Sequence, residues 1–192
     1  GNLIKRSVRD YFDNNYNEIF VNSKETLKAS RDIMKFFMPG FTKIIKLSNE
    51  KNGSLFTNNK IEHQILEMHK PIVNLKSGGY LVINQTEALV AIDVNSGKST
   101  KQRNIEDTAT KTNLEAAEEI ARQLKLRDLA GLIVIDFIDM LERPNIFKVE
   151  RKLKESVKND RARVQCGRMS NFGLLEMTRQ RLKQNISRNI LV

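Results

Sequence analysis

Two stretches of the sequence decide the fold: residues 88–94 read ALVAIDV, and residues 131–137 read GLIVIDF. Both consist of aliphatic and β-branched residues, as expected of strands, and the second is apolar enough for a strand buried on both faces. Between them, residues 105–126 carry alanine and isoleucine at helical spacing. The order of these elements predicts a layered α/β fold, in which a sheet is flanked by helices.

Further elements extend this alternation in both directions along the chain. We predict helices over residues 1–14, 24–37, 57–70, 144–159 and 174–183, and strands over residues 17–22, 43–47, 71–75, 80–84 and 163–167. We predict a turn at Lys76–Gly79 and a seam between two parts of the chain near residues 69–78. We therefore predict two domains, residues 1–70 and residues 71–192.

Composition indicates a globular protein without a membrane span. The chain has 192 residues, of which 40% are hydrophobic, enough to build a buried core. The longest apolar run, residues 129–140, is interrupted by Asp136 and Asp139 and is shorter than the roughly 20 residues that a span needs. A single cysteine, Cys166, excludes an internal disulfide framework. These features, with no signal peptide in the first residues, predict a cytoplasmic protein.

The positive charge is concentrated in the last quarter of the chain. The net charge is +10, and residues 143–192 contain thirteen Lys and Arg against four acids. Such a basic segment favours a polyanionic partner, because Lys and Arg neutralise phosphates and release counterions. The alternative is an ordinary solvated face, and charge alone leaves the two equally supported.

Two acids stand at the ends of the deciding strands. Asp93 closes ALVAID, and Asp136 closes GLIVID. An ionised acid at the end of an apolar strand is costly to bury unless it is paired or bound to a metal. If the two strands are neighbours, the carboxylates meet at one edge of the sheet, where open α/β sheets bind ligands. With Asn95 close by, the pair suits Mg²⁺; the alternative is that each Asp caps a turn.

Other motifs are weaker candidates. Residues 95–100, NSGKST, end like a phosphate-binding loop, but Ile92 stands where that motif needs its first glycine, so we reject an NTPase. His63 and His69 share a predicted helix and lack partners at metal-ligand spacing. Cys166 is expected in the core. Asp139 is expected to cap a helix, and the alternative is that it supports the two acids as a further carboxylate.

Three long stretches resemble a known family. Residues 86–100 read TEALVAIDVNSGKST, residues 112–140 read TNLEAAEEIARQLKLRDLAGLIVIDFIDM, and residues 161–181 read RARVQCGRMSNFGLLEMTRQR. They resemble the catalytic DNase I-like subdomain of RNase E/G endoribonucleases. Residues 1–70 are more loosely similar to part of that family's RNase H-like subdomain.

The resemblance implies an activity and a set of site residues. It implies Mg²⁺ ligands at Asp93 and Asp136, with Asn95 as an accessory catalytic residue. The expected reaction is cleavage of single-stranded, A/U-rich RNA to 5′-phosphate and 3′-hydroxyl ends, in rRNA processing and mRNA decay. An alternative is an RNA-binding or assembly fragment that is inactive without the family's other parts.

The resemblance also implies parts that this sequence does not show. The family's RNA-binding domain, its 5′-phosphate sensor and its CPxCxG zinc link have no counterpart here, so we expect zinc only in the full-length protein, together with homo-oligomer formation. Basic residues near the ends of the predicted catalytic elements are candidates for RNA contacts, although each is also compatible with an ordinary surface charge. These candidates are Lys98, Lys125, Arg127, Arg163 and Arg168.

Overall fold

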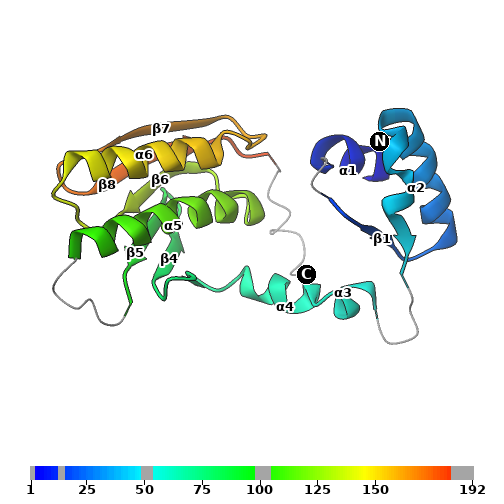
Figure 1. Ribbon diagram of the computed structural model, residues 1–192, viewed down its shortest axis with the longest axis horizontal. Helices are drawn as coiled ribbons and strands as arrows, with labels where there is room; N and C mark the ends of the chain where they lie inside the picture. The colour runs from blue at the N-terminus through cyan, green and yellow to red at the C-terminus, as the bar shows by residue number, and fades with distance from the viewer. Residues whose placement is uncertain (1–2, 13–15, 49–53, 98–104, 183–192) are drawn as a thin grey trace. The chain divides into compact units, whose positions relative to one another are not determined.

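The computed structural model divides the chain into two compact units, residues 1–67 and residues 68–192 (Figure 1). It describes residues 3–12, 16–48, 54–97 and 105–182. Each unit has its own hydrophobic cluster, and the two are considered separately. None of the described helices is both long enough and apolar enough to cross a membrane.

The first unit is small and mostly helical. Its elements are α1 (Leu3–Tyr11), β1 (Ile19–Val21), α2 (Lys24–Phe37), the 3-10 helix η1 (Pro39–Ile44), β2 (Ile45–Leu47), α3 (Leu55–Asn58) and α4 (Ile61–Glu67). The strands β1 and β2 pair in parallel, and Val21, Met34 and Ile45 form the buried cluster beside them. Ser23 is the N-cap of α2, and its hydroxyl accepts a hydrogen bond from the Thr26 N–H at 3.0 Å.

Two predictions for this unit were wrong in detail. The strand expected over residues 43–47 begins only at Ile45, because η1 occupies the residues before it. The helix expected over residues 57–70 is two short helices, separated at Lys60, whose φ of 56° lies in the left-handed region. His63 therefore lies in α4, whereas His69 lies beyond its end.

The second unit is a six-stranded mixed sheet flanked by helices, which confirms the layered α/β prediction. The strands are β3 (Ile72–Asn74), β4 (Tyr80–Gln85), β5 (Val90–Asn95), β6 (Gly131–Asp136), β7 (Val164–Met169) and β8 (Leu174–Arg179), in the spatial order β3-β4-β5-β6-β8-β7. Among the hydrogen-bonded strand pairs of this described sheet, only β5 and β6 are parallel, and α5 (Ile105–Leu126) connects them. The helix α6 (Arg143–Val157) connects β6 to β7.

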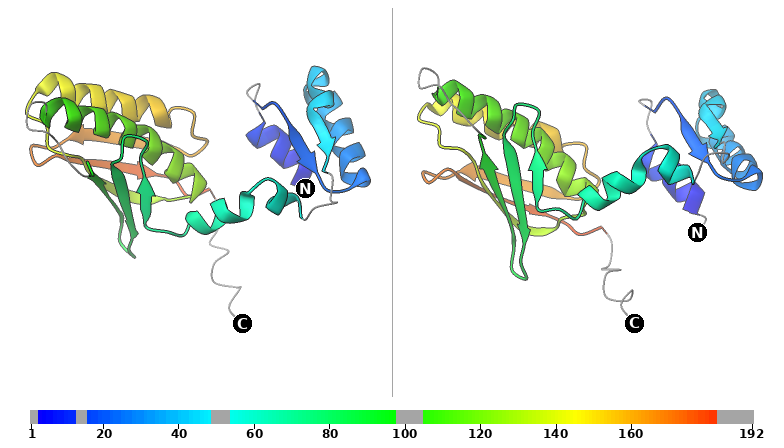
Figure 2. Two further views of the ribbon diagram at one scale, coloured as in Figure 1. Left: turned by 60° about the horizontal axis from the view of Figure 1, so that its bottom comes forward. Right: turned by 90° about the horizontal axis from the view of Figure 1, so that it is seen from below.

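Both long helices cover the same face of this sheet (Figure 2). Alternate strand residues point into the cluster beneath them, for example Ile92, Ile135 and Leu175, which are at most 1% exposed. On the opposite face Leu132 is 42% exposed, so the prediction that its strand is buried on both faces is wrong for the described unit. The sheet therefore has one packed face and one open face.

The helix predicted over residues 174–183 is instead the strand β8, Leu174–Arg179. Leucine, glutamate and methionine are good helix formers, which explains the error. In the structure Leu175, Met177 and Arg179 are buried while Glu176 and Thr178 are exposed, a period of two. Pairing with β6 and β7 has overridden local propensity. Residue 183 lies outside the described residues.

Candidate active site

The parallel register of β5 and β6 makes Asp93 and Asp136 direct neighbours. Ile92 and Ile135, the residues before them, point into the core, so the two acids lie on the open face of the sheet. Both acids are exposed. The strands are neighbours, which is the condition under which the two carboxylates meet, and β5 continues past Asp93 to Asn95.

Asn95 holds one of these carboxylates in place. It follows Asp93 by two residues on the same strand, so both side chains lie on the same face. The Asn95 side-chain Nδ2 donates a hydrogen bond to Asp93 Oδ2 at 2.9 Å. The three predicted site residues are therefore brought together, two by strand pairing and one by strand period.

The electrostatics of this pair disfavour two negative charges. Partial burial raises the pKa of Asp136, and the nearby charges of Asp93 and Asp139 raise it further. Holding two like charges this close together costs free energy, which a cation between them would offset. The site therefore has the charge and the hard oxygen atoms that a divalent cation prefers.

The loop after Asp136 is fastened by two side chains from α5. Asn113 is fully buried; its Oδ1 accepts the N–H of Ile138 at 3.0 Å, and its Nδ2 donates to the Ile138 carbonyl at 2.8 Å. Glu106 accepts the N–H groups of Leu141 and Glu142, at 2.9 and 3.2 Å. The same helix that connects the two acid-bearing strands thus fixes the path of the chain beyond the second acid.

Glu106 also receives a hydrogen bond from Asn145 at the start of α6. This bond, and those from the loop N–H groups, lower the pKa of Glu106. Sequence reasoning missed Glu106 and Asn113. A usable signal for Asn113 was an asparagine among the alanines on one side of a predicted helix, because a polar side chain on a core-facing side needs hydrogen-bond partners. The expectation that Asp139 caps a helix is wrong, because Glu142 occupies the N-cap position of α6.

The turn at residues 76–79 packs against the end of β5. Glu115 accepts the Ser77 N–H at 3.2 and 3.1 Å, and also the Lys76 N–H. A Cβ atom at Gly79 would lie 2.6 Å from the Asn95 carbonyl oxygen, a distance that real Cβ atoms do not reach. Glycine is therefore required for this turn to lie beside the strand that carries Asp93 and Asn95.

The predicted RNA-contact residues fall at different ends of the sheet. Arg168 is near the carboxyl end of β7, at the same end as Asp136, because β6 and β7 both run antiparallel to β8. Lys125 lies in the last turn of α5, and Arg163 precedes β7, so both lie at the opposite end. Lys98 lies outside the described residues. Of the described candidates, the structure therefore places only Arg168 at the end of the sheet that carries the acids.

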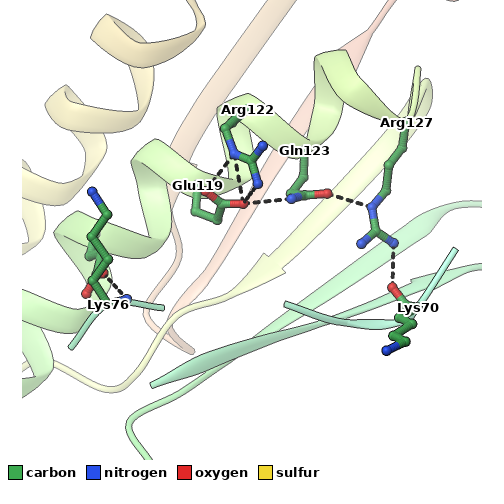
Figure 3. A network of polar contacts seen from close by, with 7 residues as sticks. Lys70, Lys76, Glu119, Arg122, Gln123 and Arg127 are labelled. Carbon is green, nitrogen blue, oxygen red and sulfur yellow. Dashed lines mark hydrogen bonds and ion pairs between the residues drawn. The ribbon is translucent and has the colours of Figure 1, made fainter. Parts of the chain in front are cut away.

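Arg127 also lies at that opposite end, where it has a structural contact network (Figure 3). Its guanidinium donates to Gln123 Oε1 at 2.6 Å and to the Lys70 carbonyl at 2.7 Å. Gln123 in turn donates to Glu119, which also holds Arg122. Burial lowers the pKa of Arg127, and the positive charge of Arg122 lowers it further. This arginine ties α5 to the chain before β3.

Other candidate groups are not placed for catalysis. Cys166 is half-buried against the core, and burial raises the pKa of its thiol despite the charge of Lys154. A thiol of this kind is a poor nucleophile. Within the described ranges, no group of three or more His, Cys, Asp or Glu side chains is placed to hold a metal ion. The pair Asp93 and Asp136 would therefore leave most positions around a cation to water or substrate.

Comparison with known proteins gives concordant matches. A family model described as the Ribonuclease E/G family matches residues 1–182. The chain is 47% identical over 184 residues to ribonuclease E of Haemophilus influenzae, and 48% identical over 186 residues to ribonuclease E of Escherichia coli. It is 37% identical over 184 residues to ribonuclease G of Escherichia coli. Each alignment covers 96% of this chain but only 20%, 17% and 37% of these relatives, respectively.

Proposed function

Because the chain belongs to the Ribonuclease E/G family, we propose that its second unit carries the active site of an endoribonuclease that cleaves single-stranded RNA with Mg²⁺. The observation that carries this proposal is the parallel register of β5 and β6, which places the carboxylates of Asp93 and Asp136 side by side on an open sheet face. An open face leaves room for an extended polynucleotide strand.

Asp93 and Asp136 would hold the cation, and Asn95 would orient Asp93 through the hydrogen bond described above. When bound, the cation supplies a Lewis acid for the scissile phosphate and lowers the pKa of a coordinated water. The exposed position of both acids leaves coordination sites for water and for phosphate oxygens, as Mg²⁺ prefers. Direct attack of water on phosphorus then needs no covalent intermediate with the protein.

The family membership and the charge of the chain support the substrate. A/U-rich single-stranded RNA, 5′-phosphate and 3′-hydroxyl ends, and roles in rRNA processing and mRNA decay follow from the resemblance of the quoted motifs. The charge of the chain agrees, because thirteen of the Lys and Arg residues lie in residues 143–192. Transient single strands bind such surfaces largely through their phosphates.

The deciding experiment is cleavage of a fluorescent A/U-rich single-stranded RNA by the purified chain, with Mg²⁺ and with EDTA. The Asp93→Asn and Asp136→Asn variants are expected to lose at least about 100-fold in rate, because each loses a charge that stabilises the cation. Glu87→Gln, which removes an acid from the turn between β4 and β5, is the matched control and should keep the wild-type rate.

Equal cleavage by wild type and both Asp variants would overturn the assignment of the site. Intact RNA in every lane, together with salt-sensitive binding that ignores Mg²⁺, would instead support the alternative of an RNA-binding fragment. Product ends are read by treatment with a 5′-phosphate-dependent exonuclease. Resistance to that enzyme would contradict the proposed 5′-phosphate.

A further inference from the structure

A cavity of about 350 Å³ lies beyond Asp136, between the loop that follows β6, the first turns of α6 and the turn between β7 and β8. It is separate from the two acids, since neither Asp93 nor Asp136 lines it. Its lining combines two cations, two carboxylates, a hydroxyl and an aromatic ring. The residues used below are Asp139, Arg143, Phe147, Glu150, Arg168 and Ser170.

The cavity begins where the candidate active site ends. Asp139 lines it and is close enough to Asp136 to raise the pKa of that acid. Gly173 also lines the cavity and lies against Asp139, since a Cβ atom added at Gly173 would be 3.2 Å from Asp139 Oδ1. The Gly173 carbonyl also accepts the N–H of Phe137, the residue after Asp136. Asp139 and the loop that carries it therefore border both the acid pair and the cavity.

The walls of the cavity are fixed before any ligand arrives. Glu150, which is 7% exposed, accepts the Met169 N–H at 2.7 Å and so ties α6 to the end of β7. The N–H of Ser170 donates to the Leu174 carbonyl at 2.8 Å, which closes the turn between β7 and β8. Glu106 fixes the facing loop, as described above. A preformed site costs less ordering free energy on binding than a flexible one.

Two arginines that line the cavity have positive charges available to a ligand. Within the part of the chain that the structure describes, the guanidinium groups of Arg143 and Arg168 have no hydrogen-bond or ion-pair partner. Both residues are exposed. Guanidinium groups bind phosphate oxygens in a forked geometry, and unpaired ones are free to do so.

The same cavity offers an aromatic surface. Phe147 lines it and is 59% exposed, so its ring is accessible to a ligand. Phe172, in the turn beside the cavity, is 84% exposed. Exposed aromatic rings next to cations are the usual means of holding single-stranded nucleic acid, because bases stack on the ring while the cations bind the backbone.

We propose that this cavity binds one nucleotide of the RNA next to the scissile phosphate, with the base against Phe147 and the phosphate at Arg143 and Arg168. The proposal rests on the proposed function and adds a substrate subsite to it. Asp139 favours a nucleotide over a bare anion, because a carboxylate repels phosphate but accepts hydrogen bonds from the amino group of a base. Residues 139–173 would then select sequence beside the cleavage site.

The test measures binding and not cleavage, so that it does not depend on catalysis. The Asp93→Asn chain in EDTA is titrated with a short single-stranded RNA and with versions in which one base at a time is removed. With Phe147 present, loss of one particular base should weaken binding by about 5- to 100-fold. With Phe147→Leu, loss of that base should have no further effect, whereas Phe147→Tyr should restore the loss.

The phosphate contact has its own readout. Arg168→Ala should reduce the slope of log affinity against log salt by about 0.7, the value for one single-strand phosphate contact. Arg122→Ala is the matched control, because Arg122 is exposed on α5 and paired with Glu119. Phe36→Ala, which removes a ring that is 82% exposed in the first unit, is the control for Phe147.

The proposal is overturned if every abasic RNA loses the same affinity with Phe147 and with Phe147→Leu, or if Arg168→Ala and Arg122→Ala have equal slopes. Inorganic phosphate that competes with RNA as strongly as a mononucleotide would also overturn it, since the base would then contribute nothing. Failure of the proposed function looks different: the wild-type chain would leave RNA intact with Mg²⁺ while the position-specific loss of affinity persists.

Discussion

The two ends of the strand pair β6 and β8 differ in the pairing and burial of their charged side chains. At one end Gly131 faces Arg179, and at the other Asp136 faces Leu174, about 17 Å away along the strand. Arg179 is 3% exposed and donates to Asp160 Oδ2 at 2.8 Å, to Asp128 Oδ1 at 2.9 Å and to the Leu129 carbonyl at 3.0 Å. Asp136 is exposed, and its nearest charges have the same sign as its own.

The difference separates charge that holds the fold from charge that remains available for a ligand. The Arg179 cluster joins the loops before β6 and before β7 to the end of β8, and its charges compensate one another. Asp93 and Asp136 have no cationic partner among the described residues, and only Asn95 touches Asp93. Burial with full pairing indicates a structural role, whereas exposed like charges on a rigid sheet indicate a binding role.

Arg179→Met should have the largest effect on this contrast. The variant leaves Asp160, whose side chain is 2% exposed, buried without its cation. Breaking a buried ion pair from one side costs about 3–5 kcal/mol in the free energy of unfolding. Chemical denaturation measures the loss, and Arg151→Met, at the exposed pair with Glu155, is the control with an expected cost below about 1 kcal/mol. Equal losses in the two variants would contradict the structural role of the Arg179 cluster.

Mg²⁺ should stabilise the opposite end of the sheet. At a concentration tenfold above its dissociation constant, a cation that binds only the folded chain adds about 1.4 kcal/mol to the free energy of unfolding. Thermal melts of the wild type should therefore shift upward with Mg²⁺, and those of Asp136→Asn should not. A shift that is equal in both proteins would place the cation elsewhere.

Asn95→Ala should have a smaller effect, confined to catalysis. One hydrogen bond to Asp93 is lost at an exposed site, which corresponds to about 1 kcal/mol and a rate about fivefold lower. Stability should stay within about 0.5 kcal/mol of the wild type. The matched control is Asn84→Ala on the neighbouring strand β4, where the side chain is also exposed. A wild-type rate in Asn95→Ala would remove this residue from the site.

The two ends should respond to acid with opposite sign. Burial would raise the pKa of Asp160, but the hydrogen bonds from Arg179 and from the Ala162 N–H lower it below its ordinary value of 3.8. Stability from Asp160 is therefore present above pH 3.8 and is lost as the pH falls through its folded pKa. The pKa of Asp136 is raised, so without metal its contribution is favourable at low pH and is lost as the pH rises through its folded pKa.

Denaturant unfolding in EDTA from pH 2 to pH 7 checks both signs. Asp136→Asn should remove the loss that occurs above pH 3.8, an effect of less than about 1 kcal/mol because the group is exposed. Asp160→Asn should remove the loss below pH 3.8. If both substitutions changed the profile in the same direction, the contrast between the two ends would fail.

How far the sequence could be followed depends on which forces set each element. The apolar runs ALVAIDV and GLIVIDF predicted two strands. When two such strands pair in parallel, their terminal acids become neighbours, because the strand period fixes the face on which each side chain lies. The segment LLEMTR was misread as a helix because its residues are good helix formers and its period of two covers only six positions. Its strand conformation comes from its neighbours in the sheet.

The supporting contacts of the site were beyond the sequence for a different reason. Asn113 and Glu106 act on backbone groups 25 to 36 residues further along the chain, and no local pattern specifies such partners. The distribution of Lys125, Arg127 and Arg163 at the far end of the sheet also depends on strand direction, which periodicity does not give. Within the site, local sequence patterns could place only the side chains on the two acid-bearing strands.

The crossover through α5 has a consequence for the time at which the site comes into being. Asp93 and Asp136 are brought together only after the whole connection between their strands has been synthesised and has folded onto the sheet, since they occupy different strands of a parallel pair. During translation, the first acid leaves the ribosome well before the second. An incomplete chain therefore has no paired carboxylates, and under the proposed function a nascent chain would not cleave the message from which it is being made until α5 and β6 have docked.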